Sequence, residues 1–137
     1  MNAVDTNVLI YAQDPRDPVK RRIANSLVCN LDDAILLWQV ACEYLAASRK
    51  LAPFGFSVDD AWDDVKELRA TWAIALPDWE VHDRARGLLQ SHGLSFWDAL
   101  LVAAGVRAGI VIFYSEDLGG RPPIDGMTFI NPFESTI

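Results

Sequence analysis

The chain has 137 residues, the length of one domain, and a chain of this size buries roughly two-thirds of its unfolded surface. Hydrophobic residues make up 51% of the sequence, which excludes an intrinsically disordered protein. The net charge of −7 argues against an architectural DNA-binding protein, which presents a broad basic face. It does not exclude a nucleic-acid enzyme, because bound cations can supply positive charge locally. We therefore expect a single domain over residues 1–137.

The sequence also bears on where the protein acts. The first ten residues reach Asp5 without a basic segment, which argues against a signal peptide. The longest apolar run, residues 93–106, is too short for a transmembrane helix and contains Asp98. Cys29 and Cys42 lack the spacing of a zinc site or a disulfide framework, and we expect both to be buried. These features predict a cytoplasmic protein without membrane contact.

Strands and helices are predicted to alternate along the chain. The expected strands are residues 1–5, 34–38, 74–76, 110–114 and 127–130. The expected helical segments are residues 8–10, 19–31, 39–50, 57–72, 78–92 and 96–108. Residues 51–56 and 119–126 contain Gly and Pro and are expected to be loops. This order predicts an α/β protein with three layers, α/β/α, around a mostly parallel central sheet.

Four acidic residues stand apart because they occur where the pattern predicts burial. Asp5, Glu43 and Asp98 are each the only charged residue in a stretch of thirteen or more residues. Asp117 follows the strand predicted over residues 110–114. Burying a carboxylate without compensation is costly, and no Lys or Arg lies in those runs to neutralise it. A divalent cation with oxygen ligands would compensate all four together.

Topology is expected to bring the four carboxylates to one edge of the sheet. Asp5 and Asp117 are expected at the carboxyl ends of strands, where ligands of open α/β sheets bind. Glu43 and Asp98 are expected one turn into helices that begin at that edge, where the helix dipole favours an anion. Charges about 4 Å apart repel by roughly 4 kcal/mol at an effective dielectric near 20. The cluster therefore predicts a Mg²⁺ or Mn²⁺ site suited to phosphodiester hydrolysis.

Each of the four could instead have an unrelated structural role, such as a helix cap, a turn or a pair with a distant arginine. For any one alone this alternative is favoured, whereas for all four it requires four coincidences. Asp117 is preferred to Glu116 because side chains alternate along extended backbone, which puts Asp117 on the side of Ser115. Asp14 could be an accessory ligand, but a role in the turn beside Pro15 is favoured.

Four parts of the sequence then follow the pattern of a known family: V-D-T-N-V-L at residues 4–9, the isolated Glu43, S-F-W-D-A-L-L-V-A-A at residues 95–104, and S-E-D-L at residues 115–118. In order and spacing they resemble the PIN-domain nucleases, particularly the VapC-type toxins of bacterial toxin–antitoxin pairs. The family commonly has Thr where this chain has Ser115, a departure that keeps the hydroxyl.

The resemblance implies an endoribonuclease in which Mg²⁺ or Mn²⁺ is held by Asp5, Glu43, Asp98 and Asp117. It implies supporting hydrogen bonds to the carboxylates or to metal-bound water from Thr6, Asn7 and Ser115. It also implies an RNA substrate, a homodimer, and a small antitoxin protein that inserts a segment into the active site. A catalytically inactive PIN-like binding module is one alternative. Another is a receiver-like phosphoryl-transfer domain, which expects a late lysine, whereas the last lysine is Lys66.

Some residues are assigned with less evidence from the pattern. Candidate contacts to RNA phosphates are Arg16, Arg49, Lys50, Arg84 and Arg86, with surface solubility as an equally good explanation. The acidic stretch over residues 59–67 is expected to be a solvated helix face. Trp62 and Trp72 are expected in the core, and His82 and His92 on an exposed helix surface without a chemical role.

Overall fold

The computed structural model describes residues 1–134, and within them every strand pairing of the sheet is parallel. The strands are β1 (Asn2–Val4), β2 (Ile35–Leu37), β3 (Ala73–Ala75), β4 (Ile112–Tyr114) and β5 (Thr128–Ile130). Strand β4 lies between β1 and β5, and β2 pairs with β3. A parallel bridge between Asn2 and Ala34 joins the two parts, which gives the order β3-β2-β1-β4-β5. The predicted parallel sheet is confirmed.

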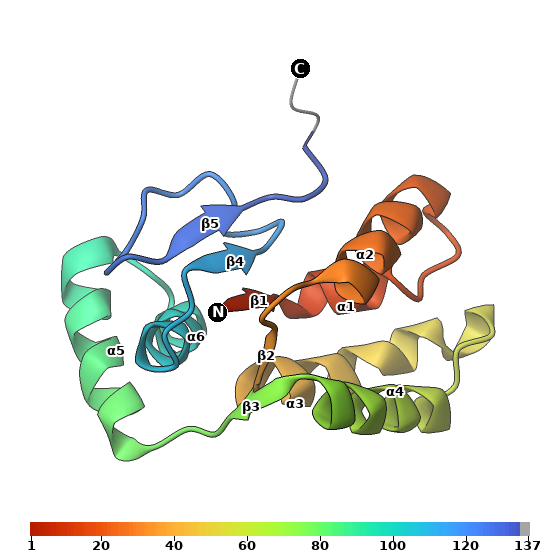
Figure 1. The fold of residues 1–137 in the computed structure, drawn as a ribbon, viewed down its shortest axis with the longest axis horizontal. Helices are drawn as coiled ribbons and strands as arrows, with labels where there is room; N and C mark the ends of the chain where they lie inside the picture. Colours follow the sequence, from red (N-terminus) through yellow and green to blue (C-terminus); the bar gives the residue numbers. More distant parts are fainter. Residues whose placement is uncertain (135–137) are drawn as a thin grey trace.

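Helices cover the sheet from both sides, as predicted for a three-layer α/β/α fold. They are α1 (Thr6–Tyr11), α2 (Pro18–Asn30), α3 (Trp38–Ala47), α4 (Val58–Thr71), α5 (Trp79–His92) and α6 (Phe96–Arg107). Figure 1 shows α5 and α6 packed side by side at the left of the strands, and α1 to α4 to the right and below. None of the helices in the described part of the chain is long and apolar enough to cross a membrane.

The third helix differs from its prediction at both ends. Helix α3 begins at Trp38, directly after β2 and without a capping side chain, so strand and helix share no loop. The expected loop over residues 51–56 is instead mostly a 3₁₀ helix, η1 (Ser48–Phe54). Gly55 ends it in the left-handed region with a φ of 96°, a conformation in which glycine has no Cβ to clash. The periodic pattern did not indicate this element because 3₁₀ turns have a different repeat.

Helix α6 has buried side chains around most of its circumference. Ala99, Leu101, Val102 and Ala103 are each at most 2% exposed. Ser95 caps the helix by accepting a hydrogen bond from the Asp98 backbone N–H at 3.2 Å. Such a helix leaves room for a charged side chain only near its ends, which explains why Asp98 occupies the first turn.

Three expectations about burial were wrong. Cys29 and Cys42 are both exposed, and the side chain of Trp62 is 59% exposed. Trp72 is partly buried and packs against the core, as expected. These exposed residues lie on outward faces of helices, and a sequence pattern cannot distinguish an apolar face that meets the core from one that meets solvent or a partner.

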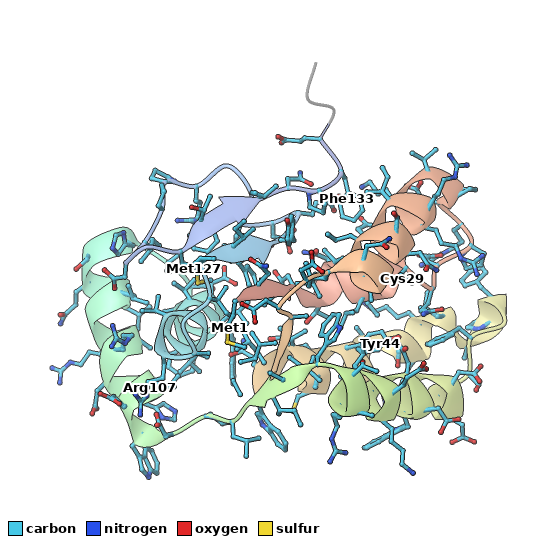
Figure 2. The ribbon with its side chains drawn as sticks, viewed as in Figure 1. Met1, Cys29, Tyr44, Arg107, Met127 and Phe133 are labelled. Carbon is cyan, nitrogen blue, oxygen red and sulfur yellow. The ribbon has the colours of Figure 1, made fainter. Side chains whose placement is uncertain are left out.

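The acidic stretch on α4 is also less solvated than expected, because Asp64 is half-buried. Tyr44 of α3, labelled in Figure 2, is fully buried. Its hydroxyl donates a hydrogen bond to Asp64 Oδ2 at 2.6 Å, which ties α3 to α4. Burial raises the pKa of Asp64, and the hydrogen bond from Tyr44 opposes that shift. The pair therefore makes one polar contact inside an otherwise apolar helix interface.

We expect Tyr44→Phe to lower the free energy of unfolding by about 1 to 2 kcal/mol, because Asp64 would lose its donor where water cannot fully replace it. Urea unfolding at neutral pH measures the change. Tyr114→Phe is the matched control, since no hydrogen bond of its hydroxyl is found within residues 1–134. Equal losses in the two variants would contradict the role given to the Tyr44 hydroxyl.

Candidate active site

All four isolated carboxylates line one cavity of about 420 Å³. Asp5 follows β1 and caps α1, and Asp117 lies three residues after β4. Glu43 is on α3, whose first residue follows the end of β2, and Asp98 is in the first turn of α6. The cavity thus lies at the carboxyl ends of neighbouring parallel strands, where sequence and topology placed it.

Asp5 is the only one of the four that is buried, with 7% of its surface exposed. Glu43 and Asp98 are partly buried, and the burial expected for Asp117 was wrong, because this residue is exposed in the loop after β4. Asp5 Oδ1 accepts a hydrogen bond from the Thr6 backbone N–H at 2.7 Å, and Asp5 Oδ2 accepts one from Ser115 Oγ at 2.8 Å. Burial raises the pKa of Asp5 to about 6, although both hydrogen bonds lower it. The charges of Glu43 and Asp117 raise it further. Asp5 is therefore an anion that its own surroundings do not neutralise.

Glu43 is oriented by two side chains. The Thr6 hydroxyl donates to Glu43 Oε2 at 3.1 Å, and Gln39 Nε2 donates to Glu43 Oε1 at 2.9 Å. The same Gln39 nitrogen donates to the Trp97 carbonyl oxygen at 3.0 Å, which links α3 to the start of α6. Sequence reasoning did not select Gln39. The available signal was its position four residues before Glu43, which places both on one helix face.

Asp117 is held by Asn7, which connects the two strand ends. Asn7 Nδ2 donates to Asp117 Oδ2 at 3.3 Å, and Asn7 Oδ1 accepts from the Glu116 backbone N–H at 3.4 Å. The buried Ser115 hydroxyl also accepts from the Leu118 backbone N–H at 3.0 Å, which closes the loop around Asp117. The three residues chosen as supporting partners, Thr6, Asn7 and Ser115, each contact at least one of the carboxylates.

Glu116 is engaged elsewhere and does not line the cavity. Its carboxylate accepts from the Tyr11 hydroxyl at 2.9 Å and from Lys20 Nζ at 2.6 Å. The Lys20 ammonium also lies 4.6 Å from the centre of the Tyr11 ring, and Tyr11 packs edge to face against Phe133. Of the two adjacent acidic residues, only Asp117 therefore faces the other carboxylates.

Asp98 differs from the other three in having an open carboxylate. Within residues 1–134 neither a hydrogen bond nor an ion pair of its side chain is found, and only its backbone N–H is engaged, by Ser95. A carboxylate that lines an acidic cavity without a partner raises the free energy of the site through repulsion. It is also free to bind an added ligand.

Asp14 lines the same cavity, yet its carboxylate is occupied by Arg16. Asp14 Oδ1 accepts from Arg16 Nε at 2.9 Å, and Oδ2 accepts from Arg16 Nη2 at 2.9 Å. This pairing agrees with a turn role and not with an accessory ligand.

Of the five suggested phosphate contacts, Arg16 and Lys50 line the cavity, and the other three do not. His82 and His92 are exposed on α5 and do not line it either.

The donors in the cavity fit a hard divalent cation. All four carboxylates supply oxygen, the ligand type that Mg²⁺ and Mn²⁺ prefer. No three His, Cys, Asp or Glu side chains of residues 1–134 approach closely enough to form a finished metal cage. The wider spacing is compatible with a hydrated ion, because uncompensated carboxylates repel one another and Mg²⁺ usually retains several waters between itself and protein.

Comparison with known proteins identifies the family. The family description for the PIN domain matches residues 3–119, so the chain belongs to the PIN-domain family. This assignment excludes the receiver-like alternative. Among curated proteins, none matches the sequence at a significant level.

Solved structures with the same fold include several toxins and toxin–antitoxin complexes. A toxin–antitoxin complex from Klebsiella pneumoniae has 19% sequence identity and a TM-score of 0.70, covering 98% of this chain and 100% of that chain. VapC20 of Mycobacterium tuberculosis, a Sarcin-Ricin loop cleaving toxin, has 16% identity and a TM-score of 0.66, covering 82% and 87%. FitAcB from Neisseria gonorrhoeae has 16% identity and a TM-score of 0.63, covering 98% and 100%. At these identities the likeness establishes the PIN fold.

The raised pKa of Asp5 predicts how the metal-free protein responds to pH. Its folded pKa of about 6 exceeds the ordinary 3.8, so folding favours the protonated form. The contribution of Asp5 to the free energy of unfolding is therefore largest below about pH 4 and is lost as the pH rises through 6. We expect Asp5→Asn to gain about 3 kcal/mol relative to wild type between pH 4 and pH 7.

Urea unfolding in EDTA, with wild type and Asp5→Asn compared at each pH, measures this difference. Carboxylates that do not interact with Asp5 titrate in both proteins and cancel. Asp59→Asn, on the exposed part of α4, is the control and should follow wild type. A difference between wild type and Asp5→Asn that stays constant with pH would show that Asp5 has an ordinary pKa.

Proposed function

We propose that this protein is a Mg²⁺- or Mn²⁺-dependent endoribonuclease that hydrolyses RNA phosphodiester bonds, and that it acts in the cytoplasm as the toxin of a toxin–antitoxin pair. The observation that carries the proposal is the convergence of Asp5, Glu43, Asp98 and Asp117 on one cavity. They come from four separate segments, and among the described residues none has a cationic partner. Residues 1–137 would form a single nuclease domain.

In this proposal the four carboxylates hold the cation, and the polar residues around them fix their orientation. When bound, the ion supplies positive charge for the phosphate and lowers the pKa of water. Ser115 and the Thr6 backbone keep both oxygens of Asp5 in place. Thr6 and Gln39 hold Glu43, and Asn7 holds Asp117. Asp98, whose carboxylate has no partner among residues 1–134, remains free to move towards a ligand.

The choice of RNA and of an antitoxin partner is supported by the family and by its structural neighbours. One neighbour is a toxin that cleaves the Sarcin-Ricin loop, and others are complexes of toxin with antitoxin. We propose that a small antitoxin binds this chain and covers the carboxylate cavity. An inactive binding module with the same fold would retain the partner but would not cleave RNA.

A homodimer is supported by an apolar surface outside the carboxylate cavity. Two hollows of about 480 and 860 Å³ share Trp38, Cys42 and Leu76. Leu76 is 69% exposed, and Trp97, in the smaller hollow, is 64% exposed. Exposed apolar residues gathered in this way mark protein interfaces more often than free surface. We propose that a second copy of the chain covers this surface, hereafter the apolar surface.

We expect Asp98→Asn to reduce the cleavage of structured RNA by at least about 100-fold, because the substitution removes a ligand charge while keeping the side-chain shape. Cleavage by wild type should require Mg²⁺ or Mn²⁺ and stop in EDTA. The assay follows a labelled RNA on a denaturing gel, with Asp59→Asn as the isosteric control. Cleavage that persists in EDTA, or an Asp98→Asn protein as active as wild type, would overturn the mechanism.

Thermal unfolding provides a measure of metal binding that does not depend on activity. Mg²⁺ at 100 times its dissociation constant should stabilise wild type by about 2.7 kcal/mol, since only the folded state binds it. Asp98→Asn should gain less at the same concentration, and Asp59→Asn should gain as much as wild type. This comparison also establishes that Asp98→Asn is folded.

For the apolar surface we expect Leu76→Asp to weaken self-association by at least about 10-fold, because the new carboxylate must lose its water when the surface is covered. Light scattering over a concentration series measures the molar mass. Val19→Asp is the matched control, because Val19 is 60% exposed on α2, away from the apolar surface. A monomeric wild type, or a dimer unaffected by Leu76→Asp, would exclude this interface.

A further inference from the structure

Two basic side chains line the carboxylate cavity, Arg16 and Lys50. They come from different segments: Arg16 from the turn between α1 and α2, and Lys50 from η1. The other charged residues of the lining are the four candidate ligands and Asp14. Positive charge at this cavity is therefore confined to two positions, although the protein has 12 Lys and Arg residues in all.

Arg16 is held in place from two sides. Asp14, which is only 6% exposed, accepts hydrogen bonds from Arg16 Nε and Nη2, both at 2.9 Å, and from the Arg16 backbone N–H at 3.0 Å. On another side the Phe54 ring lies 4.5 Å from the guanidinium carbon. An arginine that serves only solubility needs neither a buried carboxylate nor an aromatic platform. This one is fixed in a single orientation before any ligand arrives.

The guanidinium keeps binding capacity after these contacts. Arg16 has five N–H donors, and Asp14 uses two of them, which leaves three. About half of the side chain, 52%, remains exposed. A fixed guanidinium with free donors suits a phosphate group, because its planar geometry matches two phosphate oxygens.

Lys50 is placed by the same 3₁₀ helix that carries Phe54. Leu51, the next residue, is fully buried and anchors η1 against the rest of the protein. Within residues 1–134 no salt bridge of Lys50 is found. Helix η1 therefore supplies both the platform under Arg16 and a second, uncommitted cation.

The other basic residues suggested by the sequence lack this arrangement. Arg84 Nη1 lies 4.0 Å from Asp125 Oδ2, so this arginine already has an acidic partner. Neither Arg84 nor Arg86 lines the cavity. Arg49, the remaining suggested residue, does not line the cavity either. A strongly acidic cavity repels the backbone of RNA, and a metal ion would neutralise charge only where the four carboxylates hold it. Phosphates further along the strand need positive charge from the protein.

We infer that Arg16 and Lys50 form a phosphate subsite at the carboxylate cavity, which binds the RNA backbone beside the cleaved bond independently of the metal. The inference rests on the proposed nuclease function and adds to it the residues that position the substrate. Asp14 and Phe54 act through Arg16: they fix its guanidinium and do not touch the RNA.

The test measures binding of a fluorescent single-stranded RNA to the Asp98→Asn protein by anisotropy over a range of KCl concentrations. Losing one phosphate contact should lower the slope of log affinity against log salt by about 0.7, which is about fourfold weaker binding near 0.15 M KCl. We expect this loss for Arg16→Ala and for Lys50→Ala separately. Arg86→Ala removes the same charge from exposed α5 and should leave both values unchanged.

Asp14→Asn separates a positioned arginine from general electrostatics. The substitution removes a negative charge, so simple charge attraction predicts tighter RNA binding. If Asp14 fixes Arg16, binding should instead weaken, while the thermal unfolding midpoint reports whether the fold is intact. Arg16→Lys is a second variant, which keeps the positive charge but cannot donate two parallel hydrogen bonds to Asp14. It should bind RNA more weakly than the Asp98→Asn protein that retains Arg16.

Two outcomes would overturn the inference alone. One is that Arg16→Ala and Lys50→Ala bind RNA as Arg86→Ala does, and the other is that Asp14→Asn binds more tightly. Both outcomes are compatible with metal-dependent cleavage of RNA by the wild-type protein, so the proposed function would stand. If the wild-type protein neither binds nor cuts RNA, the proposed function fails, and the subsite fails with it.

Discussion

The burial of a negative charge at the end of β1 is the constraint on which the site depends. Asp5 is fixed at the end of β1, where its backbone N–H donates to the Tyr114 carbonyl at 2.8 Å. The parallel pairing of β1 with β4 then puts the buried Ser115 hydroxyl against Asp5. Two good hydrogen bonds do not overcome the burial of this carboxylate, because its pKa still rises to about 6. The end of the sheet thus holds a buried negative charge that its hydrogen-bond partners do not fully compensate.

The surrounding polar residues hold three of the four carboxylates in place. Thr6 contacts both Asp5 and Glu43, since its backbone N–H donates to one and its hydroxyl to the other. Gln39 continues the connection from Glu43 to the start of α6, the helix of Asp98. These hydrogen bonds orient the ligands, and each donor comes from a strand end or a helix. Three of the candidate ligands are therefore positioned before a cation binds, and the fourth is open.

The sequence was sufficient to predict the parts of the site that follow from periodicity and isolation. Asp5 and Asp98 could be recognised because each is the only charge in an apolar run, and alternation along the chain indicated a parallel sheet. Gln39 could not, because polar residues are common on helices and its second partner, Trp97, is far away in sequence. Arg16 was suggested only as one of five phosphate contacts, and nothing in the sequence separated it from the three that do not line the cavity. The 3₁₀ helix η1 was mistaken for a loop because Pro53 and Gly55 indicate only a break in the α-helical pattern.

Exposed aromatic residues were the other source of error, and they connect the site to the rest of the surface. Trp62 and Cys42 were expected inside because composition does not distinguish a core from an interface. At the starts of α3 and α6, residues of the apolar surface are direct neighbours of residues that form the site. Trp38 belongs to the apolar surface and its neighbour Gln39 holds Glu43, while Trp97 belongs to that surface and its neighbour Asp98 lines the cavity. The proposed dimer would therefore place a second copy next to the helix starts that carry Gln39 and Asp98.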